Sequence, residues 1–246
     1  MEVKAFVHDF ALPVQSAAVP EAQFIALLDC MQEAAGMHAD RLGAGIHVLM
    51  EKGLTWVLIR LHVRCSLLPS SGRYVRVSTW PAGRKGVYAL REFRLVDDSD
   101  GEIMCATSAW VLLNVAARRP VRLDPHLPLY TRHPGRLIED DFSSLPVLES
   151  PDRSLPFRAV AADIDINKHV NNTVYLEWAL RAVPAEVRSA QRLTVLEAAF
   201  LGEAFLGDDV LCQTQRVEED GGTVLLQRLR HARNGRELTR LRSRWR

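Results

Sequence analysis

One short stretch of the sequence concentrates side chains that can carry out acid–base chemistry. It reads DIDINKHVNNTVYLEW from position 163, and polar residues occupy every second place at its start: Asp163, Asp165, Asn167, His169 and Asn171. If the stretch is extended, Asp165, Asn167 and His169 project to one side, because alternate side chains of a strand share a face. A carboxylate, an amide and an imidazole held together are suited to acyl transfer.

A helix is expected directly after this cluster, over residues 172–183, and its pattern ends near Pro184. The first N–H groups of a helix have no partner inside the helix, and its amino end carries a partial positive charge. Such an end can stabilise the oxyanion that develops on a carbonyl during acyl transfer. We therefore predict that the backbone N–H groups of Val170 and Asn171 act as oxyanion donors.

Two structural roles and a metal site compete with this interpretation. Asn171 could serve only as a helix N-cap, and Asp165 only as a turn residue. The start D-I-D-I-N also resembles a calcium-binding loop, but that loop needs Gly at its sixth position and Glu at its twelfth. Lys168 and Val174 stand at those positions, so we predict no calcium site.

The pattern of apolar residues predicts the same order of elements twice. Residues 20–43 favour a helix, because Pro20 suits a first helical position and apolar residues recur every three or four positions. Several strand-like runs follow this helix, and a similar set follows residue 183. The repeat predicts an α+β fold of two units, each with a helix against about four antiparallel strands. Laying one half over the other places Ser66 opposite Glu203, so we expect one site per chain.

Residues 114–156 contain seven of the twelve prolines and are expected to form a linker with little regular structure. We therefore divide the chain into a first unit over residues 1–113, this linker, and a second unit over residues 157–246. The segment before the first helix, FALPVQSAAVP, has no counterpart of the polar cluster. The expected chemistry thus belongs to the second unit.

The run D-I-N-K-H-V-N-N-x-x-Y-x-x-W resembles the signature of the acyl–acyl carrier protein (acyl-ACP) thioesterases, or oleoyl-ACP hydrolases, of plants and bacteria. The resemblance extends to TWPAGRKGVYALREF, SAWVLLNVAARRPVRL and FLGEAFLGDDV, so it covers most of the chain. It implies a tandem double hotdog, with the catalytic site in the second unit and an acyl-chain cavity formed mainly by the first. It also implies hydrolysis of fatty acyl-ACP to free fatty acid and ACP in fatty acid biosynthesis, without a cofactor or metal.

The resemblance also implies which residues are catalytic. The family's Asp, Asn and His fall on Asp165, Asn167 and His169, and its Glu, on a strand further along, falls on Glu203. Glu203 would act as a general base on water or attack the thioester as a nucleophile, and both mechanisms stay open. His169 would orient Glu203 and its water. Asp165 would fix the imidazole or the local loop, and Asn167 would position the water or the carbonyl.

Two positions depart from the family pattern. Ala204 follows the catalytic Glu where plant members commonly have Cys, which removes the candidate for a cysteine nucleophile. Arg181 replaces an acidic residue that is often found after the motif tryptophan. We expect this second change to affect surface or partner contacts rather than chemistry.

The charge balance limits the partners. With 31 Lys and Arg against 30 Asp and Glu, the net charge of +1 creates no field that would recruit nucleic acid or a membrane surface. An acidic carrier protein must then meet a local basic patch. The last strand places its arginines on one face, which is either simply solvated or part of a docking patch. The candidate docking residues are Arg181, Arg188, Arg192, Arg240, Arg242 and Arg244.

Composition and cysteine spacing suggest a globular protein of a reducing compartment. Hydrophobic residues make up 48% and charged residues 25%. The four cysteines lie far apart, with neither zinc-site nor disulfide-framework spacing. The sequence lacks a signal peptide pattern and an apolar run of about 18 residues, so we expect a cytoplasmic protein without a membrane span. The oligomeric state stays open between a monomer, as a pseudo-dimer, and a homodimer.

Two functions of other classes remain as alternatives. A hotdog dehydratase or hydratase acting on acyl thioesters would use a His–Asp pair for proton transfer, but it would leave Glu203 without a role. A non-catalytic acyl-binding module would not need the intact set of polar residues. Incubation with acyl-ACP separates these alternatives, because only a thioesterase releases the carrier thiol.

Overall fold

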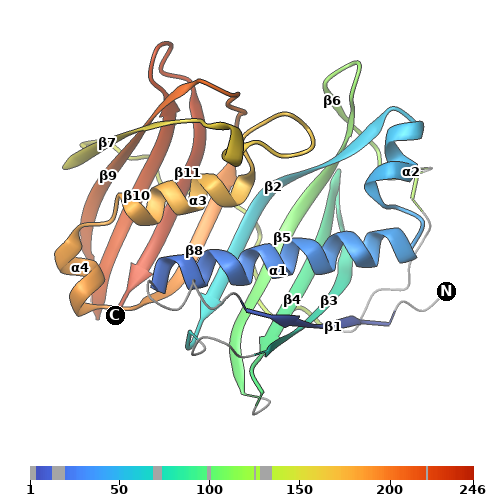
Figure 1. The fold of residues 1–246 in the computed structure, drawn as a ribbon, viewed down its shortest axis with the longest axis horizontal. Coiled ribbons are helices and arrows are strands. Elements are labelled where there is room, and N and C mark those ends of the chain that lie inside the picture. Colours follow the sequence, from blue (N-terminus) through green and yellow to red (C-terminus); the bar gives the residue numbers. More distant parts are fainter. Residues whose placement is uncertain are drawn as a thin grey trace. The chain divides into compact units, whose positions relative to one another are not determined.

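The computed structural model of the protein describes residues 4–12, 20–68, 74–98, 101–124, 126–127, 135–219 and 221–246. The chain divides into two compact units, Met1–Phe142 and Ser143–Arg246. Each unit has helices on one face of an antiparallel arrangement of strands (Figure 1). Within the described residues, no helix is both long and apolar enough to cross a bilayer.

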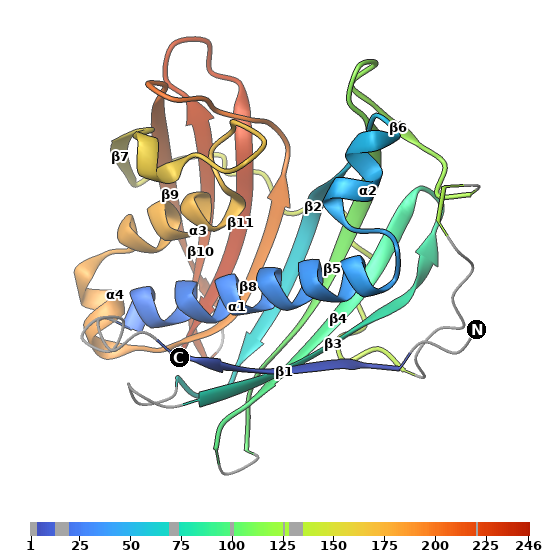
Figure 2. The ribbon, with the colours of Figure 1, turned by 45° about the vertical axis from the view of Figure 1, so that its right-hand side comes forward.

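The first unit contains a long helix and five main strands. The strands follow the spatial order β1 (Phe6–Ala11), β3 (Tyr74–Lys85), β4 (Tyr88–Val96), β5 (Glu102–Asn114) and β2 (Leu54–Cys65), and β6 (Arg119–Val121) pairs with the far end of β5. All neighbours are antiparallel. The helix α1 (Pro20–Arg41) crosses one face of these strands, and the short α2 (Ile46–Glu51) precedes β2 (Figure 2).

Burial of an apolar stripe holds α1 in place. The stripe has the spacing of three and four residues that the sequence predicts, and its most buried members are Phe24, Leu27, Leu28, Met31 and Ala34. Gly43 follows the helix with a φ of +68°, a conformation that favours glycine after a helix end. The helix predicted over residues 20–43 is thus confirmed.

The second unit repeats this architecture with shorter helices. Its strands follow the order β7 (Arg153–Arg158), β9 (Asp209–Glu219), β10 (Gly222–His231), β11 (Glu237–Trp245) and β8 (Leu193–Phe200). A 3-10 turn (Ala161–Asp163), α3 (Asn172–Arg181) and α4 (Ala185–Ala190) connect β7 to β8. The side chain of Gln227 on β10 donates to the carbonyl of Ala179 at 2.7 Å, which ties α3 to the strands beneath it.

The two units share one topology. In chain order, β7 to β11 occupy the same places in the second unit as β1 to β5 occupy in the first. Each unit has a strand before its main helix that the predicted arrangement of one helix and about four strands lacked. Short edge strands such as β1 and β7 carry weak local signals, because they depend on pairing with a distant partner strand. The repeat itself is confirmed.

Two strands lie inside the stretch predicted as a linker. β6 pairs with β5, and β7 pairs with β9, so regular structure reaches Val121 from one side and begins again at Arg153 from the other. The proline-rich stretch therefore contributes an edge strand to the second unit. Proline is tolerated there, because an edge strand leaves some N–H groups unpaired.

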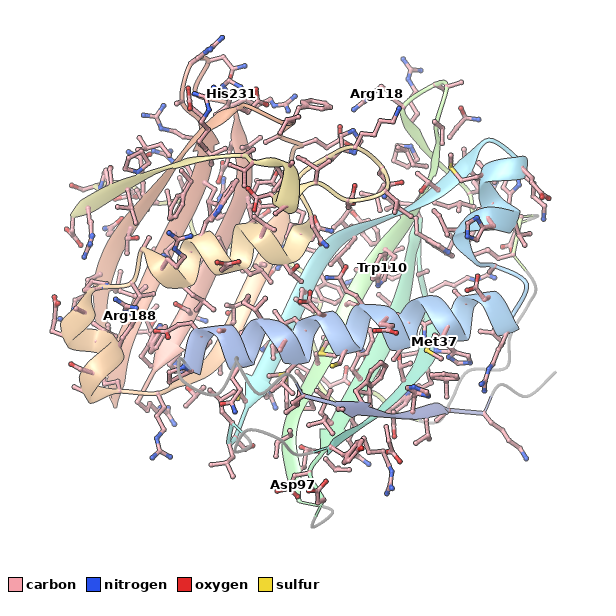
Figure 3. The ribbon with its side chains drawn as sticks, viewed as in Figure 1. Met37, Asp97, Trp110, Arg118, Arg188 and His231 are labelled. Carbon is pink, nitrogen blue, oxygen red and sulfur yellow. The ribbon has the colours of Figure 1, made fainter. Side chains whose placement is uncertain are left out.

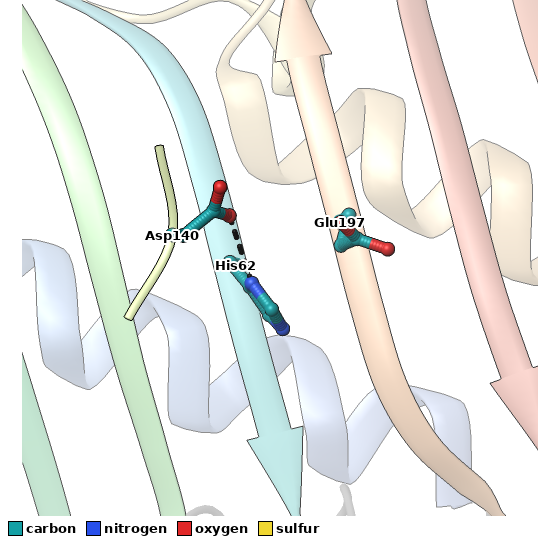
Figure 4. A group of neighbouring side chains, drawn as sticks. All are labelled: His62, Asp140 and Glu197. Carbon is teal, nitrogen blue, oxygen red and sulfur yellow. Dashed lines mark hydrogen bonds and ion pairs between the residues drawn. The ribbon is translucent and has the colours of Figure 1, made fainter. Parts of the chain in front are cut away.

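Charged contacts tie the end of the first unit to its strands. Arg136 donates to the hydroxyl of Thr107 at 3.0 Å and lies 3.4 Å from the carboxylate of Glu92, which is 0% exposed. His62 Nδ1 and Asp140 Oδ2 are 2.8 Å apart (Figure 4). Buried charges require such partners. These contacts make the part of the predicted linker around Asp140 a packed segment of the first unit.

Candidate active site

The polar cluster forms a tight hairpin and not an extended run. Ile164 and Val170 pair as an antiparallel bridge. Between them, the carbonyl of Asp165 accepts from the N–H of Lys168 at 3.0 Å, and the N–H of Asp165 donates to the carbonyl of His169 at 2.9 Å. Lys168 has a φ of +65°, which closes the turn in a conformation that few non-glycine residues adopt. The extended conformation considered for this run is not adopted, because Asp and Asn side chains favour local turns over a strand.

The carboxylate of Asp165 organises this hairpin. Its Oδ1 accepts from the backbone N–H groups of Asn167 at 2.8 Å and His169 at 3.3 Å. Its Oδ2 accepts from the side-chain amide of Asn167 at 3.3 Å. Of the two roles expected for Asp165, the structure supports fixing the loop. One N–H bond of the Asn167 amide points to Asp165, and its second can bind a substrate or water.

The hairpin brings His169 close to Glu203. His169 Nε2 and Glu203 Oε2 are 3.6 Å apart, and their side chains are 25% and 32% exposed. The distance exceeds that of a direct hydrogen bond and suits an ion pair or a bridging water. The ring of Phe205 packs edge-on against the imidazole, with 5.0 Å between centroids, and so limits its rotation.

Glu203 lies in the loop after β8 and not on a strand. Leu201 and Gly202 leave the strand by donating their N–H groups to the same carbonyl, that of Leu238 on β11, at 2.8 and 3.0 Å. The carboxylate of Glu203 then reaches solvent. The expectation, taken from the family resemblance, that Glu203 lies on a strand was therefore wrong, because the strand ends at Phe200, before the acidic residue.

The two predicted oxyanion donors are occupied. The N–H of Val170 donates to the carbonyl of Ala204 at 2.9 Å, and the N–H of Asn171 donates to the carbonyl of Asp163 at 2.8 Å. The Asn171 side chain caps α3 by accepting from the N–H of Thr173 at 3.2 Å. The oxyanion prediction was wrong, because these N–H groups hold the hairpin against its neighbours. The N-cap role of Asn171 is confirmed.

The strand arginines of the predicted docking patch are paired with acids. Hydrogen bonds join Arg240 to Glu237 at 2.7 Å, Arg242 to Glu197 and Glu219 at 3.1 Å, and Arg244 to Glu219 at 2.6 Å. The hydrogen bonds from Arg242 hold the pKa of the Glu219 carboxyl below its usual value. This face of β11 is therefore close to neutral, as a solvated strand face would be.

The six docking candidates also do not share one surface. Leu241 pairs with Gln227, whose side chain bonds to α3, so the arginines that alternate with Leu241 lie on the opposite face of the strands. Arg181 lies at the end of α3, packs over the ring of Phe157 at 5.3 Å, and is exposed. Arg188 lies on α4 (Figure 3). The prediction of one patch was wrong, because strand alternation separates its members.

Two residues to which the motif analysis gave no role touch the backbone beside Glu203. The hydroxyl of Tyr175 accepts from the N–H of Ala204 at 2.8 Å, and Arg236 Nη2 donates to the carbonyl of Glu203 at 2.6 Å. Tyr175 is the tyrosine of the motif D-I-N-K-H-V-N-N-x-x-Y-x-x-W, so the sequence did contain a signal that could have pointed to this residue. Arg236 lies in the turn between β10 and β11, and nothing in its local sequence pointed to it.

Comparison with known proteins identifies the family. Residues 4–128 match the family model of the acyl-ACP thioesterase N-terminal domain, and residues 149–246 match that of the C-terminal domain. An acyl-ACP thioesterase from Bacteroides thetaiotaomicron has the same fold, with a TM-score of 0.86 and 26% identity over 98% of both chains.

Curated plant relatives match at lower coverage of their own length. Oleoyl-acyl carrier protein thioesterase 1 of Arabidopsis thaliana is 27% identical over 80% of this chain and 59% of its own length. Palmitoyl-acyl carrier protein thioesterase of Cuphea hookeriana is 29% identical over 80% of this chain and 50% of its own length. The chain thus spans little more than half of these relatives, and its two hotdog units account for both family domains. The chain belongs to the acyl-ACP thioesterase family.

Proposed function

We propose that the protein hydrolyses fatty acyl-ACP to free fatty acid and ACP, with Glu203, His169, Asn167 and Asp165 as its catalytic set. The observation that carries this proposal is the approach of the His169 imidazole to the Glu203 carboxylate at 3.6 Å. Two loops that are distant in sequence deliver these groups to one place, and Phe205 packs beside them. The names of the relatives support acyl-ACP as the substrate.

The reaction needs one water and no other co-reactant. Glu203 takes a proton from water, and the water oxygen attacks the carbonyl carbon of the thioester. The C–S bond of the tetrahedral intermediate then breaks, and the carrier sulfur receives the proton that Glu203 held. His169 keeps the carboxylate and the water in line. At a separation of 3.6 Å, a water that sits beside the two groups can hydrogen-bond to both of them.

The oxyanion requires a donor other than the two occupied backbone N–H groups. We assign this role to the side-chain amide of Asn167. The hydrogen bond to Asp165 fixes the direction in which the NH2 group of this amide points, and the amide lies at the solvent-exposed tip of the hairpin. Removing one such donor typically costs about a hundredfold or more in kcat. Asp165 acts through Asn167 and the loop, and does not itself meet the substrate.

Direct attack by Glu203 is the alternative to general-base catalysis. The carboxylate would displace the carrier thiolate and form an acyl–enzyme anhydride, which water then hydrolyses. Mass spectrometry of enzyme quenched during turnover separates the two mechanisms. An acyl group on the peptide that contains Glu203 identifies the nucleophile, and an unmodified peptide during rapid turnover identifies the base.

The decisive test of the function is thiol release from a panel of acyl-ACPs of different chain length and saturation, with the matching acyl-CoAs as a comparison of carriers. We expect free thiol and free fatty acid in equal amounts. Conversion of hydroxyacyl to enoyl thioester without thiol would identify a dehydratase instead. Binding of acyl-ACP without any product would identify an acyl-binding module.

We further propose a cytoplasmic location and docking of the carrier near α3 and α4. The four cysteines are buried free thiols, which is the state that a reducing compartment maintains. Arg181, Arg188 and Arg192 are exposed and lie on or beside these two helices, and Arg181 also forms an ion pair with Glu177 of α3 at 3.8 Å. Charge reversal of these three should lower the association rate for ACP and leave the catalytic step unchanged.

A further inference from the structure

The peptide group that joins Glu203 to Ala204 is held at both ends by side chains from two other elements. Arg236 Nη2 donates to the carbonyl oxygen of Glu203 at 2.6 Å. The N–H of Ala204 donates to the phenolic oxygen of Tyr175 at 2.8 Å. The next carbonyl, that of Ala204, accepts from the N–H of Val170 at 2.9 Å. Three hydrogen bonds thus hold the backbone of the loop at Glu203 and Ala204.

The turn between β10 and β11 presents Arg236. Gly235 has a φ of +71°, and its N–H donates to the carbonyl of His231 at 2.9 Å. The side chain of Asn234 accepts from the N–H of Arg236 at 3.0 Å. The side chain of Arg236 extends from this turn to the loop after β8. The Nε atom of Arg236 would lie 3.5 Å from a Cβ atom placed on Gly202. The hydrogen bonds of the turn therefore hold the backbone of Arg236 at a place from which its side chain reaches Glu203.

The opposite end of the peptide is held from the core. Tyr175 lies on α3, is 1% exposed, and meets the ring of Trp178 edge-on at 5.7 Å between centroids. Burial raises the pKa of its phenol, so the hydroxyl stays protonated over the working pH range. Ala204 is itself fully buried. Its N–H would lack an acceptor if the hydroxyl were absent, which is costly in the interior.

This arrangement matters because a peptide group that is free to rotate would swing the carboxylate attached to its first residue. Productive catalytic geometry must be held within about 0.5 Å, which requires support behind the reacting groups. His169 is fixed by its own hairpin and by Phe205. On the Glu203 side, the two bonds to its peptide fix the backbone from which the carboxylate projects and so limit the positions that the carboxylate can reach.

We propose that Arg236 and Tyr175 are positioning residues that clamp the Glu203–Ala204 peptide and thereby set the carboxylate of Glu203 against His169. The role of this clamp in turnover rests on the proposed thioesterase function. The clamp itself is a property of the loop and can be measured without any substrate.

The first experiment compares Arg236→Gln with Arg233→Gln. Both arginines are exposed and lie in the same turn, so both variants lose the same charge at the same place, but only Arg236 bonds to the Glu203 backbone. We expect Arg236→Gln to lower kcat for acyl-ACP hydrolysis at least tenfold, ~1.4 kcal/mol, with KM within about threefold. Arg233→Gln should keep kcat within about twofold. Equal kcat values for the two variants would overturn the proposal.

Chemical rescue separates positioning from a loss of fold. Ethylguanidinium added to Arg236→Ala should raise kcat severalfold, because it can occupy the vacated site and donate to the same carbonyl. The same addition should leave wild type and Arg233→Ala unchanged. An Arg236→Ala protein that is folded and impaired, yet gains nothing from guanidinium ions, contradicts the assignment.

A double substitution and hydrogen exchange complete the test. Tyr175→Phe and Arg236→Gln release the same peptide, so the double variant should lose less in kcat than the product of the single losses.

Amide hydrogen exchange of residues 201–208 should speed up in Arg236→Gln and not in Arg233→Gln. This readout needs no turnover. If wild type releases no thiol, the thioesterase proposal fails while exchange still decides the clamp, and unchanged exchange in Arg236→Gln refutes the clamp alone.

Discussion

The strands β2 and β8 end in the same way, but only one of these ends is followed by an acidic residue. After each strand, two successive N–H groups donate to a single carbonyl of the neighbouring strand. The contacts are Ser66 and Leu67 to Ile103 at 2.9 and 3.4 Å, and Leu201 and Gly202 to Leu238 at 2.8 and 3.0 Å. The next residue is Leu68 in the first unit and Glu203 in the second. The same backbone hydrogen-bond pattern thus positions an apolar residue in one unit and a carboxylate in the other.

This comparison also corrects the alignment of the two halves. The sequence-based repeat placed Ser66 opposite Glu203, whereas the shared hydrogen-bond pattern places Leu68 there. The error is two residues, because the strand-like pattern continued past Phe200 while the strand did not. Neither Ser66 nor Leu68 is a base, so the expectation of one site per chain keeps its support. Residues 13–19, part of the segment before the first helix, lie outside the described residues.

Exchanging the side chains at these equivalent strand ends should have the largest effect. Glu203→Gln should nearly abolish thiol release, because the amide keeps the shape but is neither a base nor a nucleophile. Leu68→Gln, the matched change in the first unit, should keep most of the rate. Stopped assays with acyl-ACP measure both. A Glu203→Gln protein with more than about a tenth of wild-type turnover would exclude Glu203 from the mechanism.

The same variant tests the environment of Glu203. The carboxylate is 32% exposed in a loop, so its neutralisation should change the free energy of unfolding by less than about 0.5 kcal/mol. Affinity for acyl-ACP should also be unchanged. A large gain in melting temperature would instead point to a buried, unpaired charge.

His169→Ala should have the next largest effect. Loss of the imidazole should lower kcat at least about a hundredfold, the usual scale for acid–base assistance, while the fold is retained. His47→Ala, an exposed histidine on α2 of the first unit, serves as the control and should turn over normally. Circular dichroism checks folding. Near-normal turnover by a folded His169→Ala protein would remove this residue from the catalytic set.

Tyr175→Phe should destabilise the second unit by about 1–3 kcal/mol, because it leaves the buried N–H of Ala204 without an acceptor. Urea unfolding measures this loss. Tyr88→Phe in the first unit removes a hydroxyl that is only partly buried and should cost less than about 0.5 kcal/mol. Equal losses in the two variants would contradict the special role of the Tyr175 hydroxyl.

Lys168→Asn should raise stability slightly, by up to about 1 kcal/mol. Lys168 has a φ of +65°, and Asn tolerates this conformation better than Lys. The Asp165 side chain accepts from Asn167 and His169, and the variant keeps the backbone N–H of residue 168 that donates to the Asp165 carbonyl, so the thiol-release rate should stay within about twofold. Urea unfolding detects the gain. A loss of stability would indicate that the Lys168 side chain makes a contact of its own.

Thiol-blocking reagents should have the smallest effect. Burial raises the pKa of Cys30 and Cys65 in the first unit to about 11, and that of Cys212 in the second to about 12. Because these folded-state pKa values are raised, the thiols stay protonated and unreactive at pH 8, and thiolate forms only as the pH approaches these values. Iodoacetamide at pH 8 should spare activity. Rapid inactivation would reopen a cysteine mechanism.

Local patterns in the sequence were enough for most of the fold. The stripe on α1, the alternation along the main strands and the repeat of their order all follow from which residues must be buried together. The strands β1 and β7 were missed, and β8 was extended past Phe200. Such boundaries depend on pairing with strands far away in the chain, which local periodicity does not contain.

For the candidate site, the sequence was sufficient to predict which residues to group together, and only the tertiary structure shows which partners each of them has. The polar motif and the family resemblance predicted Asp165, Asn167, His169 and Glu203 as the catalytic set, and the fold brings His169 within 3.6 Å of Glu203. Only the fold shows that the expected oxyanion N–H groups are already bonded and that the β11 arginines are paired with acids. Only the fold brings Arg236 to the carbonyl of Glu203. The physical reason is that a hydrogen bond between distant segments depends on distance and direction in space, and neither is encoded in the spacing of residues along the chain.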